Sequence, residues 1–208
     1  MSSSLNYSGE IYRKSLHLLA LAYPLGYVLL GKTIALWILV PLSITAITLD
    51  LLRGKNEAVH GVFDTIFGFM MRPEERQFDP EKPPINGASW VTASFTVLAI
   101  LFPGNIAIYS FLMFMIGDAV AALVGRKLGK HRLSASSSVE GTLAFVVFGL
   151  LITLLFSHPS LPVSVAEYPT WSLLVAVFIA AGLEAAPLPM NDNIIAPLGA
   201  CLFLYLIG

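Results

Sequence analysis

The chain carries very little charge for its length. Only 12% of its 208 residues are Asp, Glu, Lys or Arg, whereas a soluble domain usually carries about 25%. A water-soluble globule is therefore excluded. Cysteine is nearly absent too: Cys201 stands alone inside an apolar run, which excludes a disulfide-rich scaffold. The net charge of −1 gives no basic surface for a polyanion, so nucleic acid is not expected as a partner.

Long apolar runs dominate the chain, with 56% hydrophobic residues and a mean hydropathy of +0.78. A helix needs about 20 mostly apolar residues to cross a bilayer. Such runs lie at roughly 15–31, 33–52, 86–103, 104–124, 139–157, 170–187 and 193–208. We therefore predict an all-α, multi-pass integral membrane protein, one polytopic domain over 1–208 with about seven transmembrane helices. A further amphipathic helix over 55–72 is expected to lie along the membrane interface.

The charged residues predict the orientation of this domain. In a seven-helix arrangement, every Lys and Arg except Lys32 falls on one side, which places the N-terminus inside the cell. Every Asp and Glu except Glu167 maps to the same side, and the positive-inside rule does not explain that bias. We expect the chemistry on this cytoplasmic face.

The segment 116–129, IGDAVAALVGRKLG, is the strongest candidate site. Asp118 ends an apolar run, where an unpaired charge costs about 2–3 kcal/mol, so a divalent cation or a basic partner is expected beside it. Small residues up to Gly129 permit close approach of a backbone or a ligand, and Arg126 and Lys130 add positive charge. An acid for Mg²⁺, small residues and a basic cluster indicate a triphosphate site. A helix end with basic flanks is the alternative.

Two further segments carry polar groups at helix ends. Ser138–Thr142 (SVEGT) opens an apolar helix, where free amides can hold a phosphate, although plain helix capping is the alternative. Glu184, Asp192 and Asn193 flank a segment broken by prolines. Broken helices near membrane depth are tolerated where they line a polar site.

The N-terminal helix and the second apolar run also end in charged residues. Arg13 and His17 share one helix face, whereas Lys14 is interpreted first as an anchor that reaches the membrane interface. Asp50 and Arg53 have the spacing of a helical ion pair.

In this order the motifs resemble the dolichol/phytol kinase family, which is similar to the CTP-dependent diacylglycerol kinases. The central block is also similar to phosphatidate cytidylyltransferases, but their longer C-terminal Asp-rich signature is missing here. The resemblance rests on Glu10-x-x-Arg13-Lys14-x-x-His17, Asp50-x-x-Arg53, Arg72-Pro-x-Glu75, Gly117-Asp118-Ala-x-Ala-Ala-x-x-Gly125-Arg126-x-x-Gly129, Ser138-x-Glu140-Gly141-Thr142 and Asp192-Asn193.

The resemblance implies a CTP-dependent kinase that transfers the γ-phosphoryl group to a lipid alcohol such as a polyprenol, dolichol or phytol. It implies Asp118, Asp192 and Glu184 as catalytic acids and Mg²⁺ ligands, with His17 or a carboxylate taking the hydroxyl proton. A cytoplasmic loop over 125–138 would bind the nucleotide. The expected nucleotide-binding residues are Arg13, Lys14, Gly117, Gly125, Arg126, Lys130, Arg132, Ser138, Glu140, Gly141, Thr142 and Asn193.

The expected partners are therefore CTP, a lipid alcohol and the membrane lipids, and a homodimer is left open. The alternatives are a cytidylyltransferase that makes a CDP-lipid and a non-catalytic transporter or scaffold. One position departs from the family pattern: Ser137 stands where the family has a Lys before its Ser-x-Glu-Gly-Thr motif. Either Lys130 or Arg132 supplies that charge, or the activity is weakened.

Overall fold

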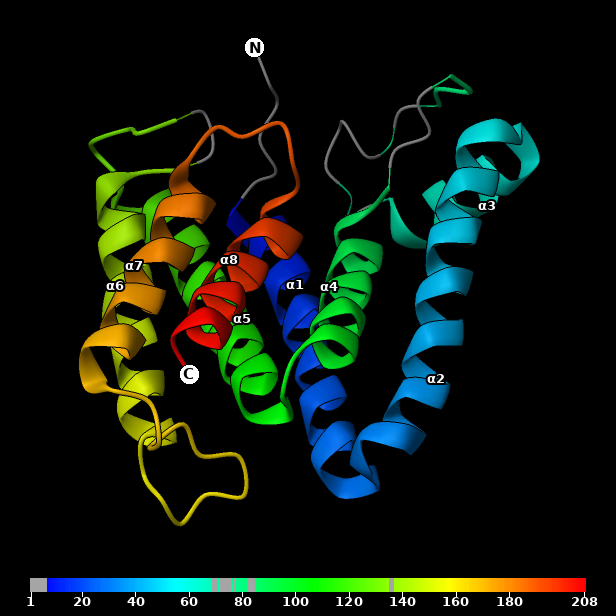
Figure 1. Ribbon diagram of the computed structural model, residues 1–208. Helices are drawn as coiled ribbons and strands as arrows, with labels where there is room; N and C mark the ends of the chain where they lie inside the picture. Colours follow the sequence, from blue (N-terminus) through cyan, green and yellow to red (C-terminus); the bar gives the residue numbers. More distant parts are fainter. Residues whose placement is uncertain (1–6, 69–70, 72–75, 77, 82–84, 135–136) are drawn as a thin grey trace.

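The computed structural model describes residues 7–68, 71, 76, 78–81, 85–134 and 137–208, and every regular element in these segments is a helix (Figure 1). The prediction of an all-helical chain is confirmed. The elements are α1 (Tyr7–Leu18), a 3₁₀ turn η1 (Leu19–Leu21), α2 (Ala22–Lys55), α3 (Glu57–Phe67), α4 (Gly87–Leu101), α5 (Gly104–Leu128), α6 (Val139–Phe156), α7 (Thr170–Ala185) and α8 (Asp192–Ile207).

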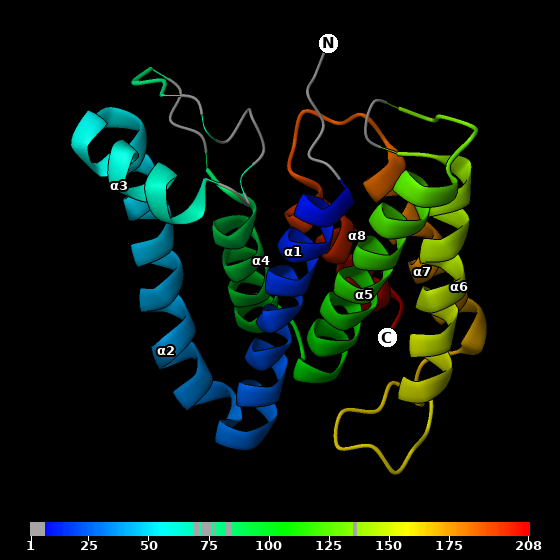
Figure 2. The same cartoon turned by 180° about the vertical axis from the view of Figure 1, so that it is seen from behind.

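Helix α2 consists of two arms that meet at Gly31. This residue has φ +80° and ψ 161°, a backbone conformation that glycine adopts without the steric cost other residues bear. The chain descends through α1 and the first arm of α2, reverses direction and rises along the second arm (Figures 1 and 2). The break expected between the first two apolar runs therefore lies at this glycine.

Among the described residues, three helical stretches are long and apolar enough to cross a membrane: Arg13–Lys55, Gly104–Leu128 and Val139–Phe156. Helices α4, α7 and α8 are apolar but shorter. A helix of 16 residues extends about 24 Å, less than the roughly 30 Å of a hydrocarbon core. The apolar helices agree with a membrane protein, while the number of seven spans and the inside position of the N-terminus stay predictions.

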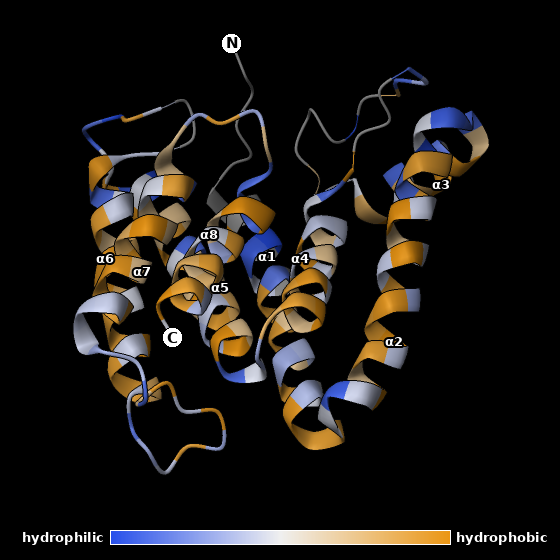
Figure 3. Cartoon of the chain, viewed as in Figure 1, coloured by the Kyte–Doolittle hydropathy of each residue, from blue (hydrophilic) through white to orange (hydrophobic). Residues whose placement is uncertain are grey.

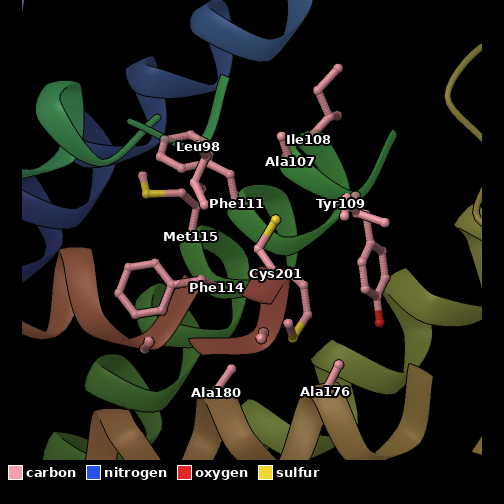
Figure 4. Packing of buried hydrophobic residues seen from close by; sticks show 14 of the residues in the cluster. Leu98, Ala107, Ile108, Tyr109, Phe111, Phe114, Met115, Ala176, Ala180 and Cys201 are labelled. Carbon is pink, nitrogen blue, oxygen red and sulfur yellow. The ribbon is translucent and has the colours of Figure 1, made fainter. Parts of the chain in front are cut away.

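Helix α5 is the centre of the bundle, because it contacts α1, α4, α6, α7 and α8. Its Phe111, Phe114 and Met115 are fully buried. They lie in one cluster with Ala180 of α7 and Cys201 of α8 (Figure 4). Cys201 is thus a free thiol of the core. Because α5 packs against five other helices, its polar residues lie close to several of them.

Glycines allow α5 and α6 to approach closely at the polar end. A Cβ atom on Gly141 would lie 2.7 Å from the carbonyl oxygen of Ala121 and 3.3 Å from the Cα of Gly125. A Cβ on Gly117, about two turns before Gly125 in α5, would meet the ring of Phe145 at 2.9 Å. The small residues of the central motif therefore serve helix packing.

The predicted interfacial helix forms over a shorter range than expected. Asn56 caps α3 by accepting hydrogen bonds from the amides of Ala58 and Val59, whereas Lys55 belongs to α2. Val62 and Ile66 of α3 are exposed. The prediction over 55–72 also includes 69, 70 and 72, which lie outside the described residues. The placement of α3 along a membrane interface stays a prediction.

Candidate functional site

The predicted site residues gather at one end of the bundle. The N-terminal end of α1, helix α3, the α5–α6 loop and the α7–α8 loop all lie there (Figures 1 and 2). Hydrophilic residues are concentrated at this end, while the helices below are mostly hydrophobic (Figure 3). The grouping of charged residues on one side, derived from the sequence, agrees with this arrangement.

A buried cluster of α1 and α5 residues forms the centre of this end. The Nζ of Lys14 donates to Oδ2 of Asp118, and the two side chains are only 5% and 7% exposed. His17, one turn along α1, places Nε2 3.6 Å from the same oxygen. Arg13 also acts on Asp118 electrostatically. Lys14 therefore supplies the basic partner expected for Asp118 and does not extend to the interface as an anchor.

Helices α7 and α8 bring two more acids toward this cluster. Glu184, in the last turn of α7, interacts electrostatically with Asp118, Asp192 and Lys14. The side chain of Asn193, at the start of α8, lies beside His17. Asn191 caps α8 by accepting from the amide of Asn193 at 3.0 Å. The prolines before α8 thus return the chain so that Asp192 and Asp118 both act on Glu184.

Several predicted site residues carry buried polar atoms that have no hydrogen-bond partner in the described part of the chain. These atoms are His17 Nε2, Thr142 Oγ1 and Glu184 Oε2. Native proteins pair nearly all buried polar groups with protein or water. Because all three atoms belong to predicted site residues at the same end of the bundle, a polar ligand is the natural partner for them.

The described residues contain no group of three His, Cys, Asp or Glu side chains close enough to form a metal site by themselves. This arrangement does not conflict with Mg²⁺, which is usually held by one or two carboxylates together with substrate phosphates. Asp118 and Asp192 each repel Glu184 electrostatically, and Oε2 of Glu184 has no hydrogen-bond partner among the described residues. The donor set fits a cation that shares its coordination with a nucleotide.

The α5–α6 loop presents two basic side chains. Its two ends are joined by the amide of Val139, which donates to the His131 carbonyl at 2.9 Å, and by an isolated bridge between Arg132 and Ser138. Lys130 and Arg132 are exposed, whereas Ser137 is buried. The charge missing at Ser137 is therefore available from two neighbours on the same loop.

The first turn of α6 is occupied by internal hydrogen bonds. Ser138 Oγ accepts from the Gly141 amide at 3.1 Å, and the Ser138 carbonyl accepts from the Thr142 amide at 2.9 Å. Glu140 pairs with Nδ1 of His131 at 2.8 Å, a contact that the sequence did not indicate. Because these amides already have partners, a ligand at this helix end would be bound by side chains such as that of Thr142.

Substituting Gly141 by Ala is expected to separate α5 from α6. The added Cβ would lie 2.7 Å from the backbone oxygen of Ala121, and overpacking of this kind costs about 1–3 kcal/mol. Detergent-solubilised protein should therefore unfold at a lower temperature than the wild type. Gly26→Ala is the control, because a Cβ at Gly26 meets nothing within 4 Å. Equal stability of the two variants would show that the helices separate without cost.

A second buried network joins α2 to the start of α4. Asp50 accepts from the Asn86 amide at 2.9 Å and from its side-chain nitrogen at 2.8 Å. Arg53 lies 3.5 Å from Asp50, which confirms the predicted ion pair. Arg53 also donates to Met71 Sδ at 3.0 Å and faces the ring of Phe63. The motif Arg72-Pro-x-Glu75 lies outside the described residues.

Arg76 joins the segment after α3 to the helix. The Nε and Nη2 atoms of Arg76 donate to the two carboxylate oxygens of Asp64 at 2.6 and 2.8 Å. The hydrogen bonds from Arg76 lower the pKa of Asp64 below its usual value. Asp64 is therefore ionised at neutral pH, and the contact is available throughout the physiological range.

A cleft of about 340 Å³ opens between α1, α3 and α4. Arg13 and His17 line it on α1, and Tyr23 lines it at the start of α2. Phe63 of α3 and Val91 of α4 complete an apolar wall. His17 thus faces this cleft and also lies beside Asp118.

No family model matches the chain, and no solved structure matches it. It is 31% identical over 199 residues to an uncharacterized protein of Rickettsia prowazekii, spanning 93% of this chain and 92% of that protein. It is 28% identical over 173 residues to CTP-dependent diacylglycerol kinase 1 of Schizosaccharomyces pombe, a match that spans 79% of this chain and 77% of that kinase. It is 36% identical over 95 residues to the phytol kinase of a Synechocystis species, a match that spans 43% of this chain and 39% of that kinase. Both kinases are named for a lipid substrate.

Proposed function

The chain belongs to the polyprenol and phytol kinase-like family, and on this basis we propose that it is a CTP-dependent kinase of a membrane lipid alcohol. The carrying observation is the buried cluster of Lys14, His17 and Asp118, in which Lys14 and Asp118 act electrostatically on Glu184 of α7. Such a cluster has little use in packing, because burying charged groups costs free energy. It suits a reaction that depends on neutralising phosphate charge.

The basic residues at this end are the groups proposed to hold the nucleotide phosphates. Lys130 and Arg132 extend from the α5–α6 loop, and Arg126 lies in the last turn of α5. Arg13 and Lys14 add charge from α1. Phosphate oxygens accept charge-assisted hydrogen bonds, which are about twice as strong as neutral ones. The hydroxyl of Thr142 would gain a partner on binding.

Asp118, Glu184 and Asp192 are the residues proposed to hold Mg²⁺ together with the nucleotide. The ion would supply neutralisation of the charge that develops on the phosphate oxygens. Lys14 would share Asp118 with the ion, and Asn193 would keep His17 oriented. The ion and Lys14 would then compensate the negative charge of the three acids.

The proposed reaction transfers the γ-phosphoryl group directly to the lipid. The hydroxyl oxygen bonds to the γ-phosphorus, the bond from that phosphorus to the β–γ bridging oxygen breaks, and CDP leaves. The hydroxyl proton passes to Nε2 of His17, which has no hydrogen-bond partner among the described residues. Asp118, 3.6 Å from this nitrogen, would stabilise the positive charge that His17 gains.

The bundle end that carries the site is proposed to face the cytoplasm, where CTP is available. The positive-inside rule supports this orientation, because Arg126, Lys130 and Arg132 lie at that end. The opposite end carries Lys32, near the reversal at Gly31.

The decisive experiment determines which phosphate of CTP is transferred to the lipid. Purified protein in lipid nanodiscs with Mg²⁺ would receive CTP labelled at the γ or at the α phosphate, together with polyprenol, dolichol, phytol, diacylglycerol or phosphatidate. We expect γ-label in the lipid product and CDP in solution. Pyrophosphate with α-label in the lipid would identify a cytidylyltransferase instead. Transfer from ATP with equal efficiency would contradict the choice of CTP.

A further inference from the structure

The cleft between α1, α3 and α4 has the chemistry of a site for one end of a lipid. Arg13 and His17 provide polar groups on α1, whereas Phe63, Phe67 and Val91 provide apolar surface. Small-molecule sites typically have this composition, with a mostly apolar wall and a few polar groups that fix orientation. The volume of about 340 Å³ lies at the lower limit of such sites, so it suits one end of a long chain.

The cleft opens to the surroundings through apolar side chains. Leu19 is 67% exposed and Phe67 is 39% exposed, and both line it. On the inner side Val91 is buried, and the hydroxyl of Tyr23 bonds to Thr92 at 2.9 Å. Entry past Leu19 and Phe67 therefore suits a ligand with an apolar chain.

His17 connects this cleft to Asp118 and Lys14. It lines the cleft and lies 3.6 Å from Asp118 through Nε2. A hydroxyl held between Arg13 and His17 would consequently be next to the groups proposed to act on the nucleotide. Wall residues on α3 and α4, in contrast, belong to helices that carry none of those groups.

We propose that the α1–α3–α4 cleft is the site of the acceptor alcohol. Its hydroxyl lies between Arg13 and His17, its first carbons contact Phe63 and Val91, and the rest of its chain leaves past Leu19 and Phe67 into the bilayer. The assignment rests on the proposed function for the identity of the acceptor. The binding of a long-chain alcohol in this cleft is testable without turnover.

The test uses photolabelling in nanodiscs. The probe is a long-chain alcohol that carries a diazirine in its alkyl chain, and the control probe is its methyl ether, which cannot donate from oxygen. We expect mass spectrometry to find label on the peptides that contain Phe63 and Val91, at least about tenfold more with the alcohol, which corresponds to 1.4 kcal/mol of discrimination. Equal labelling by both probes would overturn the assignment.

A blocking variant gives the second measurement. Ala88 is exposed and lines the cleft, so Ala88→Trp should fill it without disturbing the core. Ile100→Trp is the matched control, because Ile100 is an exposed residue of the same helix outside the cleft. We expect Ala88→Trp alone to abolish the alcohol label and to raise the KM for the lipid about tenfold, with the KM for CTP unchanged.

The outcomes separate the two proposals. Normal turnover by Ala88→Trp with an unchanged KM for lipid would overturn the cleft assignment and leave the kinase intact. The opposite result is also distinguishable. If the wild type is labelled specifically by the alcohol, if Ala88→Trp removes that label, and if the wild type phosphorylates no lipid, the cleft assignment is supported and the kinase proposal is contradicted.

Discussion

Asp118→Asn is expected to lower phosphoryl transfer to lipid by about 1,000-fold, the upper range for loss of one group that stabilises transition-state charge. Asp118 is the acid that Lys14 contacts directly and that His17 approaches to 3.6 Å. An amide at this position has no negative charge to share with a cation or with a protonated imidazole. The rate should be measured at saturating CTP and lipid, so that the loss appears in kcat.

This substitution also affects stability, and the design must separate the two effects. Lys14 is buried, so removal of its partner leaves an uncompensated charge, at a cost of about 3–5 kcal/mol. The double variant Lys14→Met, Asp118→Asn removes both charges and should recover much of that loss without recovering activity. Asp64→Asn serves as the control, because Asp64 is an acid at the same end whose partner is the exposed Arg76. Full turnover by Asp118→Asn would eliminate Asp118 from the mechanism.

The positions of the helices followed from the sequence because apolar runs and their breaks are local signals. The break near residue 32 was visible as a gap between two runs, and Gly31 provides it by adopting a positive φ. The short lengths of α7 and α8 were also visible, since prolines lie between them at 187 and 189. Membrane crossing itself depends on a bilayer, so the count of spans is a prediction from composition.

The pairing of side chains did not follow from the sequence. Asp118 and Lys14 are 104 positions apart, and no periodicity shows that α1 packs on α5. The useful signal was energetic: a carboxylate in an apolar run requires a partner, and Lys14 stands at the start of an apolar helix. Asp50 is a similar case, because its contact with Asn86 joins two helices whose proximity only the fold determines.

The start of α6 shows a different limit. The motif at Ser138 fits either a phosphate site or a capped helix, because both use a hydroxyl beside free amides. The structure pairs the Gly141 amide with Ser138 and the Val139 amide with His131. These bonds depend on how the loop returns to the helix, which the sequence motif does not encode.

Apart from substitutions of Lys14, His17 or Asp118, Asp50→Ala is expected to be the most destabilising, with a loss of about 3–5 kcal/mol in the free energy of unfolding. The side chains of Asp50 and Arg53 are each only 1% exposed, so the substitution removes one partner of a buried ion pair. It also removes the acceptor for both nitrogens of Asn86. The free energy of unfolding in mixed micelles, measured by denaturant titration, should fall by this amount.

A double-mutant cycle tests whether the loss comes from the ion pair. Arg53→Met keeps an apolar stem of similar length, and the double variant Asp50→Ala, Arg53→Met removes both charges of the pair. If the pair is responsible, the two substitutions should be non-additive by about 0.5–3 kcal/mol, with the double variant more stable than their sum predicts. Additive effects would instead assign the loss to the hydrogen bonds with Asn86, which caps α4. Because Arg53 contacts Phe63 and Met71 in the cleft wall, non-additivity accompanied by a raised KM for lipid would place this ion pair among the groups that shape the acceptor cleft.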